Sequence, residues 1–281
     1  MEIIEYGTPS APIDIFFLGD THEGNANQAT DELKQAVSII KNNPTKHTKV
    51  IGMGDYIDAI NHMDKRFNPV EICEKYKIKD LKNLPVKQVD YFIKSIEPIK
   101  DKFIAIVTGN HEEKYSKYNG FDPMHYLSER LGGVGLIGYN GFVRLSILKA
   151  NPEKHKNPER MTFDIALTHG HGGGGYLEGY PINQVYGTFR YTEADIFIMG
   201  HIHQMVCDSS TVISPYGSKL SRRRKFYGSN GCFLFKEKIG TRGYFEGHKG
   251  KPASIGMLKL SICPDHSKQD SVISLTPVFI A

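Results

Sequence analysis

Short hydrophobic runs that end in glycine recur along the chain and predict buried strands. Five of them read IDIFFLGD, KVIGMGD, FIAIVTGN, FDIALTHG and DIFIMGH, at residues 13–20, 49–55, 103–110, 163–170 and 195–201. Each holds roughly four to eight mostly apolar residues, many of them β-branched or aromatic, before a turn signal. Such runs are typical of strands that are buried on both faces of a sheet.

The segments between the first three runs have a helical pattern. Residues 26–43 predict a crossover helix, because their apolar residues recur at helical spacing. These residues are Leu33, Ala36, Val37 and Ile40. The longer polar stretch from about 59 to 101 predicts a helical insertion that is broken at Pro85.

The pattern changes after residue 205. The segments CFLFKEK, SIGMLKLSI and SVISLTPVFI, at 232–238, 254–262 and 271–280, predict further strands with no helix between them. Alternating strands and helices followed by a strand-rich end predict an α/β fold of two packed mixed β-sheets flanked by helices. With no internal repeat or low-complexity linker, we expect one domain over residues 1–281, whose strand-rich part spans about 206–281.

Composition narrows the class of protein. The 281 residues are 40% hydrophobic and 23% charged, which is typical of an ordered globular chain. The net charge of +4 permits a phosphate-bearing partner without requiring one, and Arg222–Lys225 contribute much of the excess. No run approaches the roughly 18 apolar residues that span a bilayer, so we expect no membrane partner.

The cysteines and the first residues bear on the compartment. Cys73, Cys207, Cys232 and Cys263 form no CxxC pair, which favours reduced thiols over a disulfide framework or a zinc knuckle. The opening MEIIEYGTPSAPIDIFF lacks a basic region followed by an apolar stretch, so it does not read as a signal peptide. We therefore predict a cytoplasmic protein, and nothing in the sequence indicates an obligate protein partner.

All five predicted strands end in side chains that can bind a metal ion. In chain order these side chains are Asp20 and His22, Asp55, Asn110 and His111, His169, and His201 and His203. Each pair alone is common in solvated loops, and the glycines beside them are typical of tight turns. Five strand ends in order together indicate a common site, because loops at the carboxyl ends of sheet strands meet in one crevice. We therefore expect a metal site built from carboxylate, imidazole and amide groups.

The ordered motifs GDTH, GDYID, GNHE, THGH and GHIH give the chain a family resemblance. Over roughly residues 12–205 it resembles the calcineurin-like metallophosphoesterases, in particular their stand-alone bacterial and phage-type members. That resemblance implies a sandwich of two β-sheets flanked by helices. It also implies two divalent metal ions, for which Mn²⁺ is the first choice, with Fe, Zn and Ni as alternatives that the same ligands accept.

The resemblance assigns roles to the strand-end residues. One metal would be held by Asp20, His22, Asp55 and His203, and the second by Asp55, Asn110, His169 and His201. Asp55 would bridge the two ions, and a metal-bridging hydroxide would attack the phosphorus of a phosphoester. His111 would act as a catalytic residue near the leaving oxygen rather than as a ligand. For Glu112 and Asp58, two roles remain open: orienting the ligand imidazoles, or an ordinary structural role.

Several segments bear on the substrate. His171 would lie at the rim of the site, and Gly172–Gly175 are more typical of a loop or lid than of a phosphate-binding turn. The segment KLSRRRKFYGSNG, residues 219–231, mixes basic and aromatic residues that suit a nucleic-acid backbone, although a solvated turn or strand edge is also consistent with it. We predict a phosphodiesterase that acts on a nucleotide or a single-stranded nucleic acid.

Other functions remain as alternatives. A phosphomonoesterase keeps the same motifs, so His111 does not separate the two activities. A non-catalytic scaffold of this fold is less favoured, because every expected ligand position is filled. Zincin and serine-hydrolase functions are excluded by the letters, since HEEKY is not HExxH and no GxSxG occurs.

Overall fold

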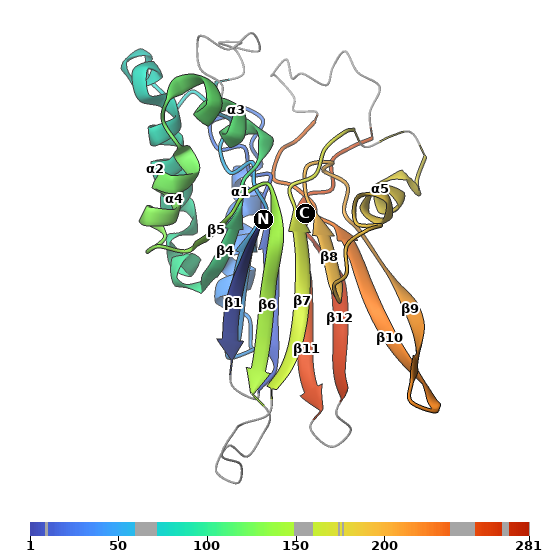
Figure 1. Ribbon diagram of the computed structural model, residues 1–281. Helices are drawn as coiled ribbons and strands as arrows, with labels where there is room; N and C mark the ends of the chain where they lie inside the picture. Colours follow the sequence, from blue (N-terminus) through green and yellow to red (C-terminus); the bar gives the residue numbers. More distant parts are fainter. Residues whose placement is uncertain are drawn as a thin grey trace.

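Two six-stranded mixed sheets form the centre of the protein (Figure 1). The computed structural model describes residues 1–8, 11–59, 72–148, 160–173, 175, 177–236, 251–265 and 270–280. The first sheet has the order β1 (Glu2–Thr8), β6 (Asn140–Leu148), β7 (Arg160–Thr168), β8 (Ile196–Met199), β10 (Lys219–Ser229) and β9 (Val206–Tyr216). The second has the order β12 (Asp270–Phe279), β11 (Gly256–Asp265), β2 (Ile13–Leu18), β3 (His47–Gly52), β4 (Phe103–Val107) and β5 (Gly135–Ile137).

Strand β2 illustrates why the glycine-ended runs are apolar throughout. All six of its residues are buried. Ile15 and Phe17 point into the core between the two sheets, whereas Phe16 and Leu18 pack against the helices on the other face. Each of the five predicted runs contains a strand of the structure, namely β2, β3, β4, β7 and β8.

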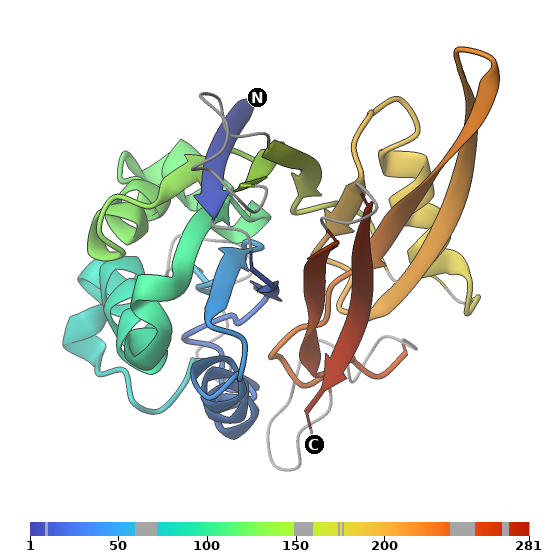
Figure 2. The same cartoon turned by 90° about the horizontal axis from the view of Figure 1, so that it is seen from below.

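Helices cover the outer face of both sheets, so the predicted architecture is confirmed (Figures 1 and 2). On the second sheet lie α1 (Thr30–Lys41), α2 (Leu84–Ile96), α3 (Asn110–Asn119) and α4 (Pro123–Arg130), with the 3₁₀ helices η2 (Ile78–Asn83) and η3 (Glu97–Lys102). On the first lies α5 (Tyr180–Thr188). The buried face of α1 consists of the four apolar residues that predicted the helix.

The insertion at about 59–101 differs from its prediction in one respect. Residues 60–71 lie outside the described residues, and the rest holds η2, α2 and η3. Pro85 does not break a helix but lies in the first turn of α2. A proline is tolerated there because the first helical N–H groups have no partner within the helix.

Of the three segments after residue 205 that predict strands, 254–262 and 271–280 lie largely on β11 and β12, whereas 232–236 form no strand; β9 and β10 are additional. Residues 232–236 form only isolated bridges, Cys232 with Ile255 and Leu234 with Gln28, and 237–238 lie outside the described residues. The segment is apolar because it is buried: Phe233 is fully covered and its N–H donates to the carbonyl of Asp20. The hydrophobic pattern of this buried connecting segment was therefore mistaken for that of a strand.

Two further features concern the helices and the cysteines. No helix in the described ranges is long and apolar enough to cross a membrane. The four cysteines are all free.

Candidate metal centre

The structure brings the eight strand-end residues together at one edge of the sandwich. Donor atoms of three groups of residues lie within 4.8 Å of one another: Asp20, His22 and His203; His22, Asp55 and His111; Asp55, His169 and His201. Because His22 and Asp55 each belong to two groups, the groups adjoin. Asn110 joins them through its Oδ1, which lies 3.1 Å from His169 Nε2.

His169 is held in the tautomer that a metal ligand needs. Its Nδ1 lies 2.8 Å from the carbonyl oxygen of Met53, and because a carbonyl only accepts, Nδ1 carries the hydrogen. In the neutral ring Nε2 therefore has a free lone pair. That atom lies 3.1 Å from Asp55 Oδ2 and 3.3 Å from His201 Nδ1. A backbone carbonyl that orients a ligand imidazole in this way is typical of metal sites.

The electrostatics of the cluster favour a cation. Burial alone would lower the pKa of His169, but the carboxylates of Asp55 and Asp20 raise it to about 9. Burial would raise the pKa of Asp55, yet the imidazoles around it hold that pKa well below its usual range. Burial and the neighbouring His169 lower the pKa of His201 to about 4, which keeps its ring neutral.

Unpartnered polar atoms point to the same conclusion. Asp20 Oδ1 and His22 Nδ1 are buried without a well-formed hydrogen bond among the residues that the structure describes. Their nearest charged neighbours are His203 Nε2, 3.2 Å from Asp20 Oδ1, and Asp58 Oδ1, 3.6 Å from His22 Nδ1. His22 Nε2 and His203 Nε2 face each other at 3.4 Å. Several acceptor atoms thus converge with few donors among them, which is costly unless a cation satisfies them. The residues present therefore fit divalent metal ions.

The backbone at the site is held in an unusual conformation. Six non-glycine residues have a positive φ in the described part of the chain: Asp20 (49°), His22 (44°), Asp55 (48°), Ala59 (52°), His201 (71°) and His203 (55°). Five of the six are predicted metal ligands. Such left-handed residues are uncommon and cost of the order of 1–3 kcal/mol each, and they concentrate at functional sites.

Gly54 and Gly109 are required by close approach rather than by a turn alone. A Cβ on Gly109 would lie 2.1 Å from the Asp55 amide nitrogen, and one on Gly54 would lie 2.6 Å from His169 Nδ1. Both glycines therefore let the loops after β3, β4 and β7 come together.

The contacts of Glu112 are those of a structural residue and not of one that orients a ligand imidazole. Glu112 is 1% exposed and accepts the backbone N–H groups of Gly109, Asp55 and Ile57, each at 3.1 Å. Burial and the carboxylate of Asp55 raise its pKa to about 7. It thus fixes the loops rather than an imidazole. Asp58, in contrast, lies beside an imidazole, with its Oδ1 3.6 Å from His22 Nδ1.

The predicted substrate-facing segments lie in different places. His171 is exposed, and its carbonyl accepts a hydrogen bond of 2.6 Å from Gln184 Nε2. Of the glycine run after it, Gly174 lies outside the described residues.

Arg222–Lys225 lie on β10, in the β9–β10 hairpin that extends from the body of the protein, away from the loops that carry the donors (Figures 1 and 2). Arg223 and Lys225 are paired with Asp195 and Glu193.

The two aromatic residues of that basic segment are not available to a nucleic acid. Phe226 is buried in the core between the sheets. Tyr227 is stacked on Phe197, with ring centroids 4.7 Å apart and planes within 6°. The base-stacking interpretation of residues 219–231 is therefore wrong for these two side chains, because their strand alternation turns both onto packed faces.

The sequence interpretation missed two residues at the site. Tyr139 packs the edge of its ring against His169, with centroids 5.7 Å apart, and its hydroxyl donates to the Gly170 carbonyl. Cys232 is fully buried near His203. Burial alone would lower the pKa of His203, but Cys232 and Asp20 outweigh burial and hold that pKa well above its usual value. No local motif marks either residue, since both come from connecting segments.

Comparison with known proteins identifies the family. The family model of the calcineurin-like phosphoesterases matches residues 13–205, which is more than half of the chain. The chain belongs to the calcineurin-like phosphoesterase family. The family and the donor groups together support a metal-dependent phosphoesterase, a hydrolase that acts on a phosphoester.

Comparison with solved structures and with curated proteins adds no information on the activity. A solved structure similar to this family member is GAP50, the anchor in the inner membrane complex of Plasmodium. It is 12% identical, with a TM-score of 0.45, over 96% of this chain and 90% of that chain. No curated protein matches the chain.

Proposed function

We propose that the chain is a dinuclear phosphodiesterase that acts on a nucleotide or nucleic acid. The observation that carries this proposal is the gathering of carboxylate, amide and imidazole donors around Asp55. One metal ion would be held by Asp20, His22, Asp55 and His203, and the other by Asp55, Asn110, His169 and His201. When bound, two divalent ions supply an activated water and positive charge against the phosphoryl oxygens.

Mn²⁺ is the first choice of metal. A mixed set of oxygen and imidazole ligands suits Mn²⁺, Fe²⁺, Zn²⁺ and Ni²⁺, and the resemblance to the family's stand-alone members makes Mn²⁺ our first choice. A shared carboxylate is also what two neighbouring cations need, and Asp55 is 2% exposed, so its charge is weakly screened by water.

His111 is the proposed proton donor to the leaving oxygen. Its Nδ1 lies 2.5 Å from the Asp58 carbonyl oxygen, so Nδ1 carries a hydrogen and donates it there. This leaves Nε2 for the substrate, and a proton passes from Nε2 to the leaving oxygen only from the imidazolium form of the ring. The ring also packs edge-on against His22, with centroids 4.8 Å apart, which holds it beside the metal ligands.

The distribution of cations supports a diester over a monoester. Across the described residues, no lysine or arginine forms an ion pair with Asp20, Asp55 or Asp58. A phosphomonoester carries up to two negative charges near neutral pH, whereas a diester carries one. Where no lysine or arginine of the described residues reaches these carboxylates, the bound metals would supply the positive charge, which suits the single charge of a diester.

The test compares bis-p-nitrophenyl phosphate with p-nitrophenyl phosphate on metal-stripped protein resupplied with Mn²⁺. We expect metal-dependent hydrolysis of the diester, and loss of both activity and bound metal in Asp55→Asn. Preference for the monoester would make the protein a phosphatase. No turnover of either ester with metal demonstrably bound would favour the scaffold alternative.

We also propose that residues 1–281 form a single domain. This is supported by the core between the sheets, to which β2, β3 and β11 contribute from one sheet and β6, β7 and β8 from the other. The free cysteines agree with the cytoplasm, which stays a prediction.

A further inference from the structure

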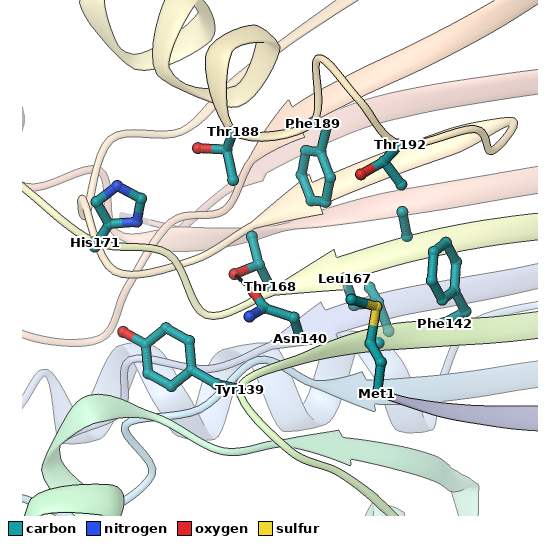
Figure 3. Close-up of a pocket in the computed structure, with 12 residues that line it drawn as sticks. Met1, Tyr139, Asn140, Phe142, Leu167, Thr168, His171, Thr188, Phe189 and Thr192 are labelled. Atoms are coloured by element: carbon teal, nitrogen blue, oxygen red, sulfur yellow. Dashed lines mark hydrogen bonds between the residues drawn. The ribbon is translucent and has the colours of Figure 1, made fainter.

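A cavity of about 390 Å³ lies on the outer face of the first sheet. Figure 3 shows its walls: β6 and β7 with the turn before β6 on one side, and the end of α5 with the segment after it on the other. None of the seven proposed metal ligands lines it. Its size lies within the range of small-molecule sites, roughly 300–1,000 Å³.

The cavity is next to the proposed metal centre. Thr168 lines it and directly precedes His169 in the chain. Tyr139 also lines it, and its ring packs against His169 while its carbonyl accepts the His169 N–H at 3.1 Å. His171, from the same loop as His169, completes this end of the cavity (Figure 3). A ligand in the cavity would thus lie one side chain away from the donors.

The end near the metal centre offers oriented hydrogen-bonding groups. The Thr168 hydroxyl is buried, accepts the Gly170 N–H at 3.1 Å and lies 2.5 Å from Asn140 Oδ1, to which it donates. That bond fixes the amide of Asn140, so its two Nδ2 hydrogens are left for a ligand. The Thr188 hydroxyl, which donates to Met199 Sδ at 3.8 Å, can accept from a ligand, and Thr192 adds a hydroxyl at the far end of the cavity (Figure 3).

The rest of the lining is largely apolar and includes two aromatic rings, with Met1 and Leu167 beside them. Phe142 and Phe189 come from opposite walls in Figure 3, and Ala166 between them leaves room. Among the described residues, no lysine, arginine, aspartate or glutamate side chain lines the cavity, and Met1 at the amino terminus lies at its edge. It is therefore suited to a neutral, flat group with a hydrogen-bonding edge. An acyl chain would leave the Asn140 amide and the hydroxyls without partners, which costs free energy.

We propose that this cavity binds the nucleoside part of the substrate, while the phosphate of the same molecule reaches the metal centre. The inference rests on the proposed phosphodiesterase function and narrows it to small nucleotides. The aromatic walls stack on the base, the Asn140 amide reads its edge, and His171 lies between the sugar and the metal loops.

The first test uses binding alone, on metal-stripped protein without any phosphate. Adenosine, guanosine, cytidine and uridine are each titrated by equilibrium dialysis, with ribose as the control probe. We expect at least one nucleoside to bind and ribose not to bind. Phe142→Ala should weaken nucleoside binding about tenfold, the scale of one stacking contact. Phe279→Ala, the same change at a ring that is 66% exposed outside the cavity, should leave it unchanged.

A second variant guards against misfolding, because Phe142 also packs against the apolar cluster under α5. Asn140 is exposed and accepts the Thr168 hydroxyl, so Asn140→Asp, which keeps that acceptor and removes the Nδ2 hydrogens, should keep the melting temperature while weakening nucleoside binding several-fold. Failure of every nucleoside to bind, or equal binding by the wild type and both cavity variants, would overturn the inference.

Kinetics separate the inference from the function on which it rests. Phe142→Ala should raise the KM for thymidine 5′-p-nitrophenyl phosphate about tenfold and leave bis-p-nitrophenyl phosphate hydrolysis within twofold. Hydrolysis of both esters with no variant effect on the thymidine ester would refute the cavity alone. Nucleoside binding with hydrolysis of neither ester would refute the phosphodiesterase and leave the cavity as a nucleoside site.

Discussion

Five metal-ligand candidates lie in left-handed backbone, a conformation that an unliganded loop has little reason to keep. Asp20 and Asp55 are held there by hydrogen bonds between the loops after β2 and β3: the Asp20 N–H donates to the Gly54 carbonyl, and the Asp55 carbonyl accepts the His22 N–H. The fold thus fixes the donors before any metal arrives. Preorganised donors bind metal without a further cost of ordering, which agrees with a catalytic site.

His111→Ala should lower turnover by about 10²-fold while leaving the bound Mn²⁺ unchanged. The physical reason is that His111 would donate a proton to the leaving oxygen and would not hold a metal. The loss should be larger for a dinucleotide, whose alkoxide leaves poorly, than for bis-p-nitrophenyl phosphate. Turnover of both esters and metal content by elemental analysis provide the measurements.

His125→Ala serves as the matched control for that variant. The His125 side chain is 72% exposed on α4, so both activity and metal content should stay at wild-type values. Full activity of His111→Ala on the dinucleotide would contradict the proton-donor role, and loss of metal would make His111 a ligand instead.

At the scale of elements, the turn before α3 should tolerate no side chain. Gly109→Ala places a methyl group against the Asp55 amide and carboxylate, so either the β4–α3 turn or the Asp55 loop must move. We expect Mn²⁺ affinity to fall at least tenfold with the fold retained, measured by titration and circular dichroism. Gly138→Ala is the control, since its Cβ would meet no atom within 4 Å. Equal affinities of the two variants would contradict this account.

Asp14 ties β2 to the loop after α1 and to β11. Its Oδ2 accepts from Thr45 Oγ1 at 2.6 Å and Asn43 Nδ2 at 2.8 Å, and Lys259 Nζ lies 3.5 Å away. Burial would raise the pKa of Asp14, but hydrogen bonds from Ser261, Thr45 and Asn43 and the charge of Lys259 lower it overall. The ionised form is therefore favoured by folding.

The sign of the pH effect follows from that lowered pKa. The stabilisation is present above the unfolded pKa of about 3.9 and is lost as pH falls through the lower folded value. Asp14→Asn should cost about 1.5–3 kcal/mol of unfolding free energy at pH 7, the scale of hydrogen bonds to a charged group, and the difference should shrink below pH 4. Urea unfolding across pH measures it.

Asp31→Asn is the control for that comparison, because the Asp31 side chain is 81% exposed in a surface pair with Lys34. Its unfolding free energy should stay within a few tenths of a kcal/mol of the wild type at every pH. A gap between wild type and Asp14→Asn that persists unchanged at pH 3 would contradict the lowered pKa.

At the scale of the whole molecule, the sequence was most informative where both faces of an element are buried. The fully buried β2 and the amphipathic α1 were predicted at their observed positions. The edge strand β1 was missed because its burial alternates and most of its side chains are exposed. For residues 232–236 the prediction of a strand was wrong, because their apolar character reflects burial of the side chains and not a β conformation of the backbone.

The site shows the same division. The grouping of the donor side chains was predictable because each of them directly follows a hydrophobic run that ends in glycine. The residues that hold the donors in place were not predictable. Glu112, Tyr139 and the Met53 carbonyl act through contacts that form only when the two sheets pack together. The cavity beside His169 likewise arises between α5 and the strands, with no motif of its own.

The donors come from both sheets, so metal binding should stabilise the whole sandwich. Asp20, His22 and Asp55 follow strands of one sheet, whereas His169 and His201 follow strands of the other. Mn²⁺ at 100 times its dissociation constant adds about 2.7 kcal/mol if only the folded state binds it. At about 2 °C per kcal/mol for a chain of this size, the melting temperature should rise by about 5 °C. Chelation should reverse the rise, and Asp55→Asn should show little of it. An equal rise in wild type and Asp55→Asn would place the bound metal elsewhere, because a site that joins the sheets cannot lose its shared carboxylate without losing that stabilisation.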